Sequence, residues 1–225
     1  MNHAEKKPTR LWLVRHGQTD WNAQRRIQGH TPTELNAVGL QQADLLSQWF
    51  STRRFAAIWS SDLPRALQTA QAIAARQNCS ITTTAQLRER SLGVFEGKTW
   101  DEVRSMRADL TNSATNNGDL ADWTGVPGVE SDQQLWDRTR GILDTMSNAG
   151  EGKDILAVTH GGVLKHVIWH VLGLPSGAPR RFGLSNGLTA VLEKREHHYY
   201  LKSLLDVELL MGRESAADTA NAPSA

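Results

Sequence analysis

The stretch LWLVRHG, residues 11–17, decides the fold more than any other part of this sequence. Four apolar residues stop abruptly at an arginine and a histidine, which is typical of a short strand buried on both faces. Residues 55–59 and 155–158 repeat the pattern, since each is an apolar run followed by polar residues. Residues 81–84 are rich in β-branched side chains and predict a further strand.

Amphipathic helices are expected between these strands, because apolar residues recur at helical spacing in the intervening segments. The first expected helix covers residues 38–50, and the second has Pro64 in its first turn and Ser61 or Asp62 as its N-cap. A capping box at Thr99 and Glu102 predicts a short third helix, and Ser131 is expected to cap the fourth. The fifth covers residues 163–172 and is expected to end at Gly173. Two late runs, residues 188–192 and 199–204, predict antiparallel strands joined across residues 194–198.

Strands that alternate with helices predict an α/β fold, here a three-layer α/β/α arrangement with a mostly parallel central sheet. No internal repeat or linker divides the chain, so we expect one domain over residues 10–208. Residues 1–9 are interpreted as a polar N-terminal extension and residues 209–225 as a disordered tail. Residues 109–130, polar and rich in Asn and Gly, are interpreted as a long loop or lid.

The overall composition disfavours several classes of partner. The 225 residues carry 25 basic and 24 acidic side chains, a formal net charge of +1, which gives no support to binding of nucleic acid or a membrane surface. The polar N-terminus shows no signal peptide, and no apolar run approaches the roughly 20 residues that span a bilayer. The single cysteine, Cys79, cannot form an internal disulfide, which fits a reducing compartment, so we expect a cytoplasmic protein.

Ionisable side chains follow four of the expected strands at the point where each strand ends. Arg15 and His16 follow the first strand, and Arg65 opens the helix after the second. Glu89 follows the third strand and His160 follows the fourth. In a mostly parallel sheet, ligands bind where the carboxyl ends of the strands open into loops. The four loops are therefore expected to bring these side chains to one site.

The chemistry of these side chains fits a phosphate dianion. Arginines offer paired N–H donors to phosphate oxygens, and a glycine after each histidine, Gly17 and Gly161, lets backbone N–H groups approach an anion. An imidazole such as that of His16 can attack phosphorus and form a covalent intermediate. A carboxylic acid such as Glu89 can protonate the departing alkoxide and then activate water.

Several segments in order along residues 10–205 closely resemble the signature of the histidine phosphatase superfamily, in its phosphoglycerate-mutase-like branch. The segments are LVRHGQTDWN (13–22), RRIQGH (25–30), SSDLPRALQTA (60–70), LRER (87–90), FEG (95–97) and VTHGG (158–162). Residues 127–131, PGVES, resemble a Pro-Gly-Gly-Glu-Ser motif with one glycine lost, and residues 33–36 depart from the Pro-Leu-Thr common in relatives.

The resemblance implies a phosphoglycerate-mutase-like fold and specific roles for residues of the site. His16 would carry the phosphoryl group, and Glu89 would act as acid and base. The side chains that would hold the phosphoryl oxygens are those of Arg15, Arg65 and His160. The positions that line the substrate side of the family's pocket are matched by Asn22, Gln28 and Gly29.

Three functions are compatible with these residues. The first is a phosphatase that hydrolyses a small phosphomonoester, and the second is a cofactor-dependent phosphoglycerate mutase, which shares the catalytic set. Residues 109–130 contain no Lys or Arg, unlike the longer basic insertion of such mutases, so water is the favoured acceptor. The third is a phosphate-binding module that has lost the reaction, and it is disfavoured because both the nucleophile and the acid are present.

No metal and no cofactor are expected. His166 and His170 have the spacing of a zinc pair on a helix, but no carboxylate completes a site, and the chain has no P-loop motif. A second anionic group of the substrate could meet one of several basic residues that could equally be solvated, namely Arg90, Lys98, Arg180 and Arg181. The identity of the phosphomonoester and the oligomeric state stay open.

Overall fold

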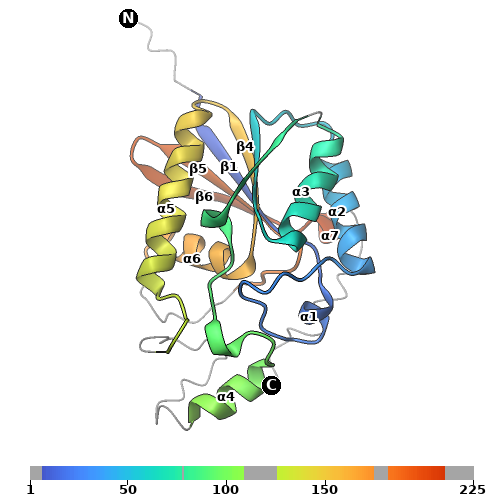
Figure 1. Cartoon of the computed structure of the whole chain (residues 1–225). Helices are drawn as coiled ribbons and strands as arrows, with labels where there is room; N and C mark the ends of the chain where they lie inside the picture. The colour runs from blue at the N-terminus through green and yellow to red at the C-terminus, as the bar shows by residue number, and fades with distance from the viewer. Residues whose placement is uncertain (1–6, 78, 109–125, 175–181, 211–225) are drawn as a thin grey trace, which may run out of the picture.

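The opening stretch of the sequence forms β1 (Thr9–Arg15), an interior strand of a six-stranded sheet with the order β3-β2-β4-β1-β5-β6 (Figure 1). The computed structural model describes residues 7–77, 79–108, 126–174 and 182–210. The remaining strands are β2 (Ala57–Ser61), β3 (Ile81–Thr84), β4 (Asp154–Thr159), β5 (Thr189–Arg195) and β6 (His198–Leu205).

Parallel pairing joins the four strands that lead into the expected site. β1 pairs with β4, and β2 pairs with both β4 and β3, all in parallel. β5 pairs antiparallel with β1 and with β6, so the last two strands form a hairpin on the other side of β1. The prediction of a mostly parallel central sheet is confirmed.

Helices cover both faces of this sheet, as expected for a three-layer α/β/α fold (Figure 1). The helices are α1 (Asp20–Ala23), α2 (Ala37–Phe50), α3 (Pro64–Ala75), α4 (Trp100–Ala108), α5 (Asp132–Ala149), α6 (Gly161–Val171) and α7 (Val207–Leu210), with 3₁₀ turns at Ala85–Leu87 and Gly93–Phe95. α5 and α6 pack on one face and α2 and α3 on the other, while α1 and α4 lie near one end of the sheet.

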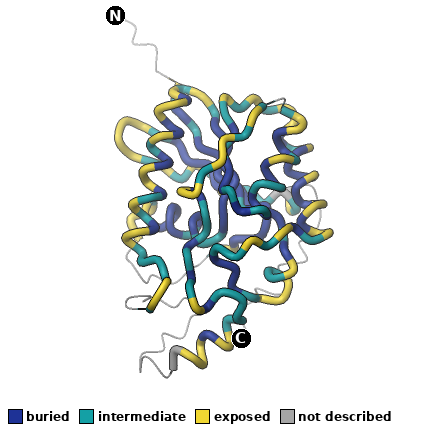
Figure 2. Tube along the Cα trace, in the orientation of Figure 1, coloured by how far each residue is buried: buried dark blue, intermediate teal, exposed yellow. Residues whose placement is uncertain are grey.

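Alternate residues of β1 show why the sheet is covered on both faces. Leu11 and Leu13 belong to the core cluster formed with α5 and α6, whereas Trp12 and Val14 belong to the cluster formed with α2 and α3. None of the four is more than 4% exposed, and Figure 2 shows the middle of the sheet as buried. A strand packed on both faces needs apolar residues at every position, which explains the uninterrupted LWLV run.

Several of the expected helix ends are confirmed in detail. Ser131 caps α5 with a reciprocal capping box, and Thr99 and Glu102 form the same arrangement at the start of α4. Gly173, with φ of +64°, follows α6 in the left-handed conformation that commonly ends a helix.

The prediction that Ser61 or Asp62 caps α3 is wrong. The N-cap is Leu63, which makes no side-chain cap bond, and Pro64 is the first residue of the helix. Ser61 Oγ instead lies 2.8 Å from the ring of His160, and Asp62 forms an ion pair with Arg88. Both polar side chains therefore bind residues of other loops, and the helix begins at a proline, whose fixed φ suits the first helical position.

Several strand boundaries also differ from the prediction. β2 begins at Ala57, and the ring of Phe55 before it packs edge-on against Trp12, with 6.1 Å between ring centroids. β5 and β6 extend into the connection expected at residues 194–198, so the turn between them consists of Glu196 and His197 alone.

Parts of the interpreted flanking segments and loop lie outside the described residues. These parts are residues 1–6 of the extension, 109–125 of the loop or lid, and 211–225 of the tail. β1 begins one residue before the expected domain boundary at 10, and α7 ends two residues after the boundary at 208. Within the described ranges, no helix is long and apolar enough to cross a membrane.

Two glycines allow the loop after β1 to rest directly on the first turn of α2. A Cβ atom on Gly39 would lie 2.0 Å from the carbonyl oxygen of Gln18, and a Cβ atom on Gly17 would lie 2.5 Å from the carbonyl oxygen of Gly39. These are backbone atoms that cannot rotate away. The contact fixes the loop that carries His16, because Gly17 is the next residue along the chain.

We predict that Gly39→Ala lowers the free energy of unfolding by about 1–3 kcal/mol, because the added methyl group overpacks the loop. Gly141→Ala is the matched control, since it also lies in a helix but has nothing within 4 Å of the added Cβ. The control should be neutral or raise stability by about 0.5–1 kcal/mol through helix propensity. Chemical denaturation measures both changes, and equal effects of the two substitutions would contradict this account of the contact.

Candidate active site

The four loops that follow the parallel strands meet at one end of the sheet, as the sequence predicts. Arg65 Nε lies 3.3 Å from His16 Nε2, and the rings of His16 and His160 are 5.0 Å apart between centroids. The Glu89 carboxylate accepts a hydrogen bond of 2.9 Å from the backbone N–H of Gly162, two residues beyond His160. All the residues proposed for catalysis therefore lie within one cluster of contacts.

His16 is held in a defined tautomer by its two ring contacts. Nδ1 lies 2.7 Å from the carbonyl oxygen of Gly17, which can only accept, so Nδ1 carries the hydrogen. Nε2 faces Nε of Arg65, which can only donate, so Nε2 presents its lone pair. The ring is 2% exposed. A backbone carbonyl group therefore fixes the second ring nitrogen of His16.

The surroundings of His16 also favour its neutral form. Burial, followed by the positive charges of Arg65 and Arg15, lowers the pKa of His16 well below the ordinary 6.5. Arg65 itself remains a cation at neutral pH, because burial lowers its pKa only to about 10. An unprotonated imidazole thus lies directly against a charged guanidinium.

Backbone carbonyl groups of the loop after α1 orient Arg65, which is 1% exposed. Its Nη1 donates to the carbonyl oxygen of Thr31 at 2.9 Å, and its Nη2 donates to that of Gly29 at 2.8 Å. The Glu96 carboxylate holds this loop by accepting hydrogen bonds from the backbone N–H groups of His30 and Thr31 and from the Thr31 hydroxyl. Glu96 appeared in the sequence only as part of the FEG segment, and nothing in the pattern indicated this contact.

Arg15 and His160 complete the ring of polar groups around His16. Arg15 extends from the end of β1 and donates to the carbonyl oxygen of Leu184, and a Cβ atom on Gly161 would lie 3.2 Å from its Nε. His160 is fully buried, and burial together with the charge of Arg65 lowers its pKa well below 6.5. Its Nε2 lies 2.8 Å from Ser61 Oγ, while its Nδ1 is buried without a hydrogen-bond partner among the described residues.

Glu89 lies against the start of α6. Its Oε1 accepts from the N–H of Arg90 at 2.8 Å, and its Oε2 accepts from the N–H of Gly162. A Cβ atom on Gly162 would lie 2.2 Å from Glu89 Oε1, so only glycine lets the carboxylate reach this position. Gly161 was expected in the site from the sequence and Gly162 was not, although the double glycine after His160 was a visible signal.

The three residues expected at the substrate rim lie in the loop beside Arg65. Gln28 Oε1 accepts from the hydroxyl groups of Thr19 and Thr33, and Asn22 completes a capping box with Thr19 at α1. Gly29 contributes its carbonyl oxygen to Arg65. These residues therefore order the loop, whatever else they contact.

Asn186 has a structural role that the sequence did not distinguish from that of an ordinary turn residue. Its Nδ2 donates to the carbonyl oxygen of His16 at 3.0 Å and to Asn22 Oδ1 at 3.3 Å. It joins the loop before β5 to the backbone of His16, and the Asn-Gly dipeptide at 186–187 was its only signal.

Three other side chains named from the sequence, those of Arg90, His166 and His170, have partners of their own. Arg90 pairs with Asp132 at the start of α5, and Arg180 and Arg181 lie outside the described residues. His170 stacks on Trp136 with 3.8 Å between ring centroids, and His166 Nε2 lies 3.2 Å from the carbonyl oxygen of Asp132. Within the described ranges, no group of three or more His, Cys, Asp or Glu side chains is arranged to hold a metal ion.

Burying two neutral histidines has a consequence for stability. In the native state the pKa values of His16 and His160 are lowered, whereas in the unfolded chain they return to about 6.5. Below that pH the unfolded state binds more protons, so the free energy of unfolding should decrease as pH falls below about 6.5. Each histidine should contribute a slope of up to about 1 kcal/mol per pH unit.

Denaturant unfolding at about pH 7 and about pH 5.5 measures this effect, and His16→Gln and His160→Gln should each make the pH dependence shallower. His197→Gln, at an exposed turn position, is the control and should leave the dependence unchanged. If the free energy of unfolding depended equally steeply on pH in the wild type and in all three variants, the lowered pKa values of His16 and His160 would be contradicted.

Comparison with known proteins agrees with this geometry. The family model of the histidine phosphatase superfamily, branch 1, matches residues 11–207. A probable phosphoglycerate mutase, GpmB, from Salmonella choleraesuis is 37% identical over 193 residues, which cover 84% of this chain and 86% of that protein.

Two solved structures have the same fold over nearly their whole length. Phosphoserine phosphatase from Entamoeba histolytica, in complex with 3-phosphoglyceric acid, has a TM-score of 0.74 and 31% identity, covering 88% of this chain and 97% of that one. A mycobacterial glucosyl-3-phosphoglycerate phosphatase in complex with VO3 has a TM-score of 0.73 and 29% identity, covering 86% and 97%. The chain therefore belongs to the histidine phosphatase superfamily, in its phosphoglycerate-mutase-like branch, a membership that supports a phosphatase or mutase-like activity.

Proposed function

We propose that this protein hydrolyses a small phosphomonoester through a phosphohistidine on His16. The observation that carries the proposal is the buried lone pair of His16 Nε2, which lies beside the guanidinium of Arg65 and the ring of His160. A neutral nucleophile surrounded by positive charge and N–H donors suits attack on a dianionic phosphate.

In the first proposed step, the Nε2 lone pair of His16 forms a bond to phosphorus while the ester P–O bond breaks. The electron pair of the broken bond leaves on the alcohol oxygen, which takes the proton of Glu89. The alcohol departs as a neutral molecule, and Glu89 becomes a carboxylate. The N–H groups of Arg90 and Gly162 donate hydrogen bonds to this side chain and hold it in place.

In the second proposed step, a water oxygen bonds to phosphorus and the water gives one proton to the Glu89 carboxylate. The P–N bond breaks, and its electron pair returns to Nε2 of His16. The products are inorganic phosphate and the enzyme in its starting protonation state.

The other groups of the site would bind the phosphoryl oxygens and the rest of the substrate. Arg15 and Arg65 supply positive charge, and Nδ1 of His160 is a buried nitrogen without a hydrogen-bond partner in the described part of the chain. The backbone N–H of Gly161 is a further candidate donor. The N–H of Gly17, expected from the sequence to approach the anion, instead donates to Thr69 Oγ1 at 3.1 Å. The residues that we place at the substrate rim are Asn22, Gln28 and Gly29.

We also propose that the reaction needs no metal ion. Side chains of this chain supply both requirements that a metal often meets, since His16 provides the nucleophile and two arginines provide the positive charge. The reaction should therefore proceed at full rate in the presence of EDTA.

Water is proposed as the acceptor of the phosphoryl group for two reasons. Residues 109–130 contain no Lys or Arg that could hold a second phosphate, and the two solved relatives described above are phosphatases by name. A phosphoglycerate mutase is the second candidate, favoured by the 37% identity to the probable Salmonella mutase. A silent phosphate-binding module is disfavoured because His16 and Glu89 are both in place.

We predict that His16→Ala abolishes turnover and that Glu89→Gln slows it by about 10²–10⁴-fold. Full-length protein is incubated with a ³²P-labelled phosphomonoester in EDTA and quenched in base, which preserves phosphohistidine. The label should appear on the peptide that contains His16, and His197→Ala should behave as the wild type.

Three outcomes would contradict this proposal. Retained turnover in His16→Ala, or label on another amino acid, would remove His16 as the nucleophile. Isomerisation of 3-phosphoglycerate faster than its hydrolysis would favour the mutase.

A further inference from the structure

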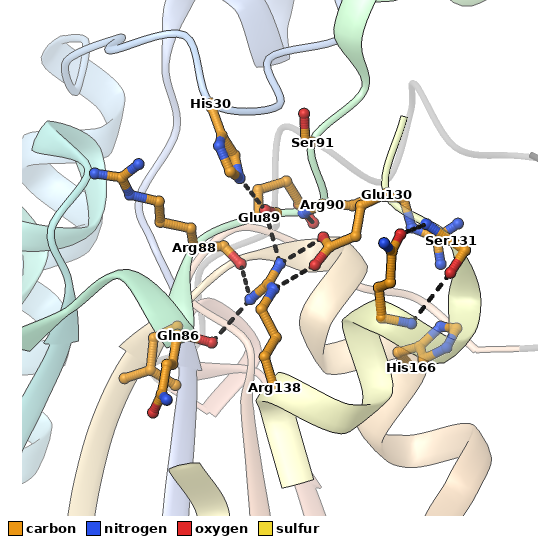
Figure 3. A network of polar contacts seen from close by, with 12 residues as sticks. His30, Gln86, Arg88, Glu89, Arg90, Ser91, Glu130, Ser131, Arg138 and His166 are labelled. Carbon is orange, nitrogen blue, oxygen red and sulfur yellow. Dashed lines mark hydrogen bonds and ion pairs between the residues drawn. The ribbon is translucent and has the colours of Figure 1, made fainter. Parts of the chain in front are cut away.

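One arginine of α5 binds the backbone of the loop that carries Glu89 (Figure 3). The Nη1 group of Arg138 donates to the carbonyl oxygens of Gln86 and Arg88, both at 2.8 Å, and Nη2 donates to that of Glu89 at 3.0 Å. The other edge of the guanidinium binds Glu130, with Nε to Oε1 at 2.6 Å and Nη2 to Oε2 at 2.8 Å. An arginine has five N–H donors, and these five bonds use all of them.

From this geometry we propose that Arg138, locked by Glu130, is the positioning residue of the acid Glu89. The inference rests on the proposed function, in which Glu89 exchanges a proton with the leaving alcohol and with water. Arg138 touches no reacting atom in this scheme, and it acts through the backbone on either side of Glu89.

The bonds of Arg138 restrain both peptide groups that flank the Cα atom of Glu89. The carbonyl of Arg88 belongs to the peptide group before Glu89, and the carbonyl of Glu89 belongs to the one after it. His30 Nε2, at 2.8 Å, also donates to the carbonyl oxygen of Glu89. With both peptide planes held, the side chain leaves the backbone in one direction and reaches the N–H of Gly162.

Glu130 keeps the guanidinium in place and joins it to a second strip of backbone. The side chains of Arg138 and Glu130 are 19% and 13% exposed, so water screens the pair only weakly. The N–H of Glu130 donates to the carbonyl oxygen of Ser91, and the Ser91 hydroxyl donates to that of Gly128. Residues 126–130, the described end of the expected loop, are thereby attached to the segment that follows Glu89.

A lysine could not reproduce this arrangement. Its ammonium group is a compact charge with three donors, whereas the planar guanidinium faces three carbonyl oxygens on one side and a carboxylate on the other. Arg138→Lys keeps the positive charge opposite Glu130 but should lose part of the restraint on the loop.

The test separates steps that need the proton of Glu89 from steps that do not. An alkyl phosphate requires protonation of its poor leaving group, whereas 4-nitrophenyl phosphate releases a stable phenolate without it. Rapid-quench measurement of the first turnover on full-length protein gives the rate of phosphohistidine formation for each substrate. Arg138→Ala should slow this step by about 10²-fold with the alkyl phosphate and by less than about threefold with 4-nitrophenyl phosphate. Arg138→Lys should also slow the reaction of the alkyl phosphate more than that of 4-nitrophenyl phosphate, but by a smaller factor.

A double-mutant comparison distinguishes positioning from general structural support. If Arg138 acts through Glu89, then Arg138→Ala should cause no further loss in a Glu89→Gln background. Arg140→Ala is the matched control, because Arg140 lies two residues along α5, is 66% exposed and has its ion-pair partner Asp144 at 4.0 Å. It should match the wild type with both substrates.

Three results for the rate of phosphohistidine formation would overturn the inference. They are an equal decrease with both substrates in Arg138→Ala, additive decreases in the double mutant, and an unchanged rate in Arg138→Ala. If Arg138→Ala does not fold, as judged by circular dichroism, Arg138→Lys carries the same comparisons. Absence of any phosphohistidine in the wild-type protein would overturn the proposed function as well. Normal transfer to His16 combined with any of the first three outcomes would overturn only the role of Arg138.

Discussion

The contact between the guanidinium of Arg65 and the neutral imidazole of His16 is the interaction on which the rest of the site depends. A buried charge is costly unless hydrogen bonds replace its water shell, and the carbonyl oxygens of Gly29 and Thr31 do so for Arg65. Carbonyl oxygens satisfy the donors without cancelling the full positive charge. The charge therefore remains available to lower the pKa of His16 and to attract an anion.

Most of the geometry around this pair is made by backbone groups that other loops hold in place. The carbonyl of Gly17 fixes the His16 tautomer, Glu96 holds the loop that binds Arg65, and Arg138 holds the loop that carries Glu89. Close packing at Gly39 and Gly162 leaves each loop little room to move. A preorganised site of this kind needs little rearrangement when charge develops during the reaction.

The sequence predicted the parts of the structure that depend on local pattern. The apolar run before Arg15 marked a strand covered on both faces, and the polar residues after each parallel strand marked the site, because strand ends and helix starts have short-range signals. The family resemblance added specific roles for His16 and Glu89.

The sequence could not predict contacts that join distant segments through backbone carbonyls. Nothing near Arg138 indicates that it meets residues 86–89, some fifty positions away. Ser61 and Asp62 had the right chemistry for a helix cap but bind His160 and Arg88 instead. Such choices are decided by tertiary packing, which local propensity does not describe.

We propose that His16 Nε2 is the atom of this chain that bonds to phosphorus. A crystal structure of the protein with vanadate, which imitates the five-coordinate phosphoryl group, tests that claim most directly. Vanadium should be bonded to Nε2 of His16, with its oxygens contacted by Arg15, Arg65 and His160 and with Glu89 beside the oxygen opposite the imidazole. Vanadate bound at another position, or bound here with Nε2 of His16 turned away from it, would contradict the account.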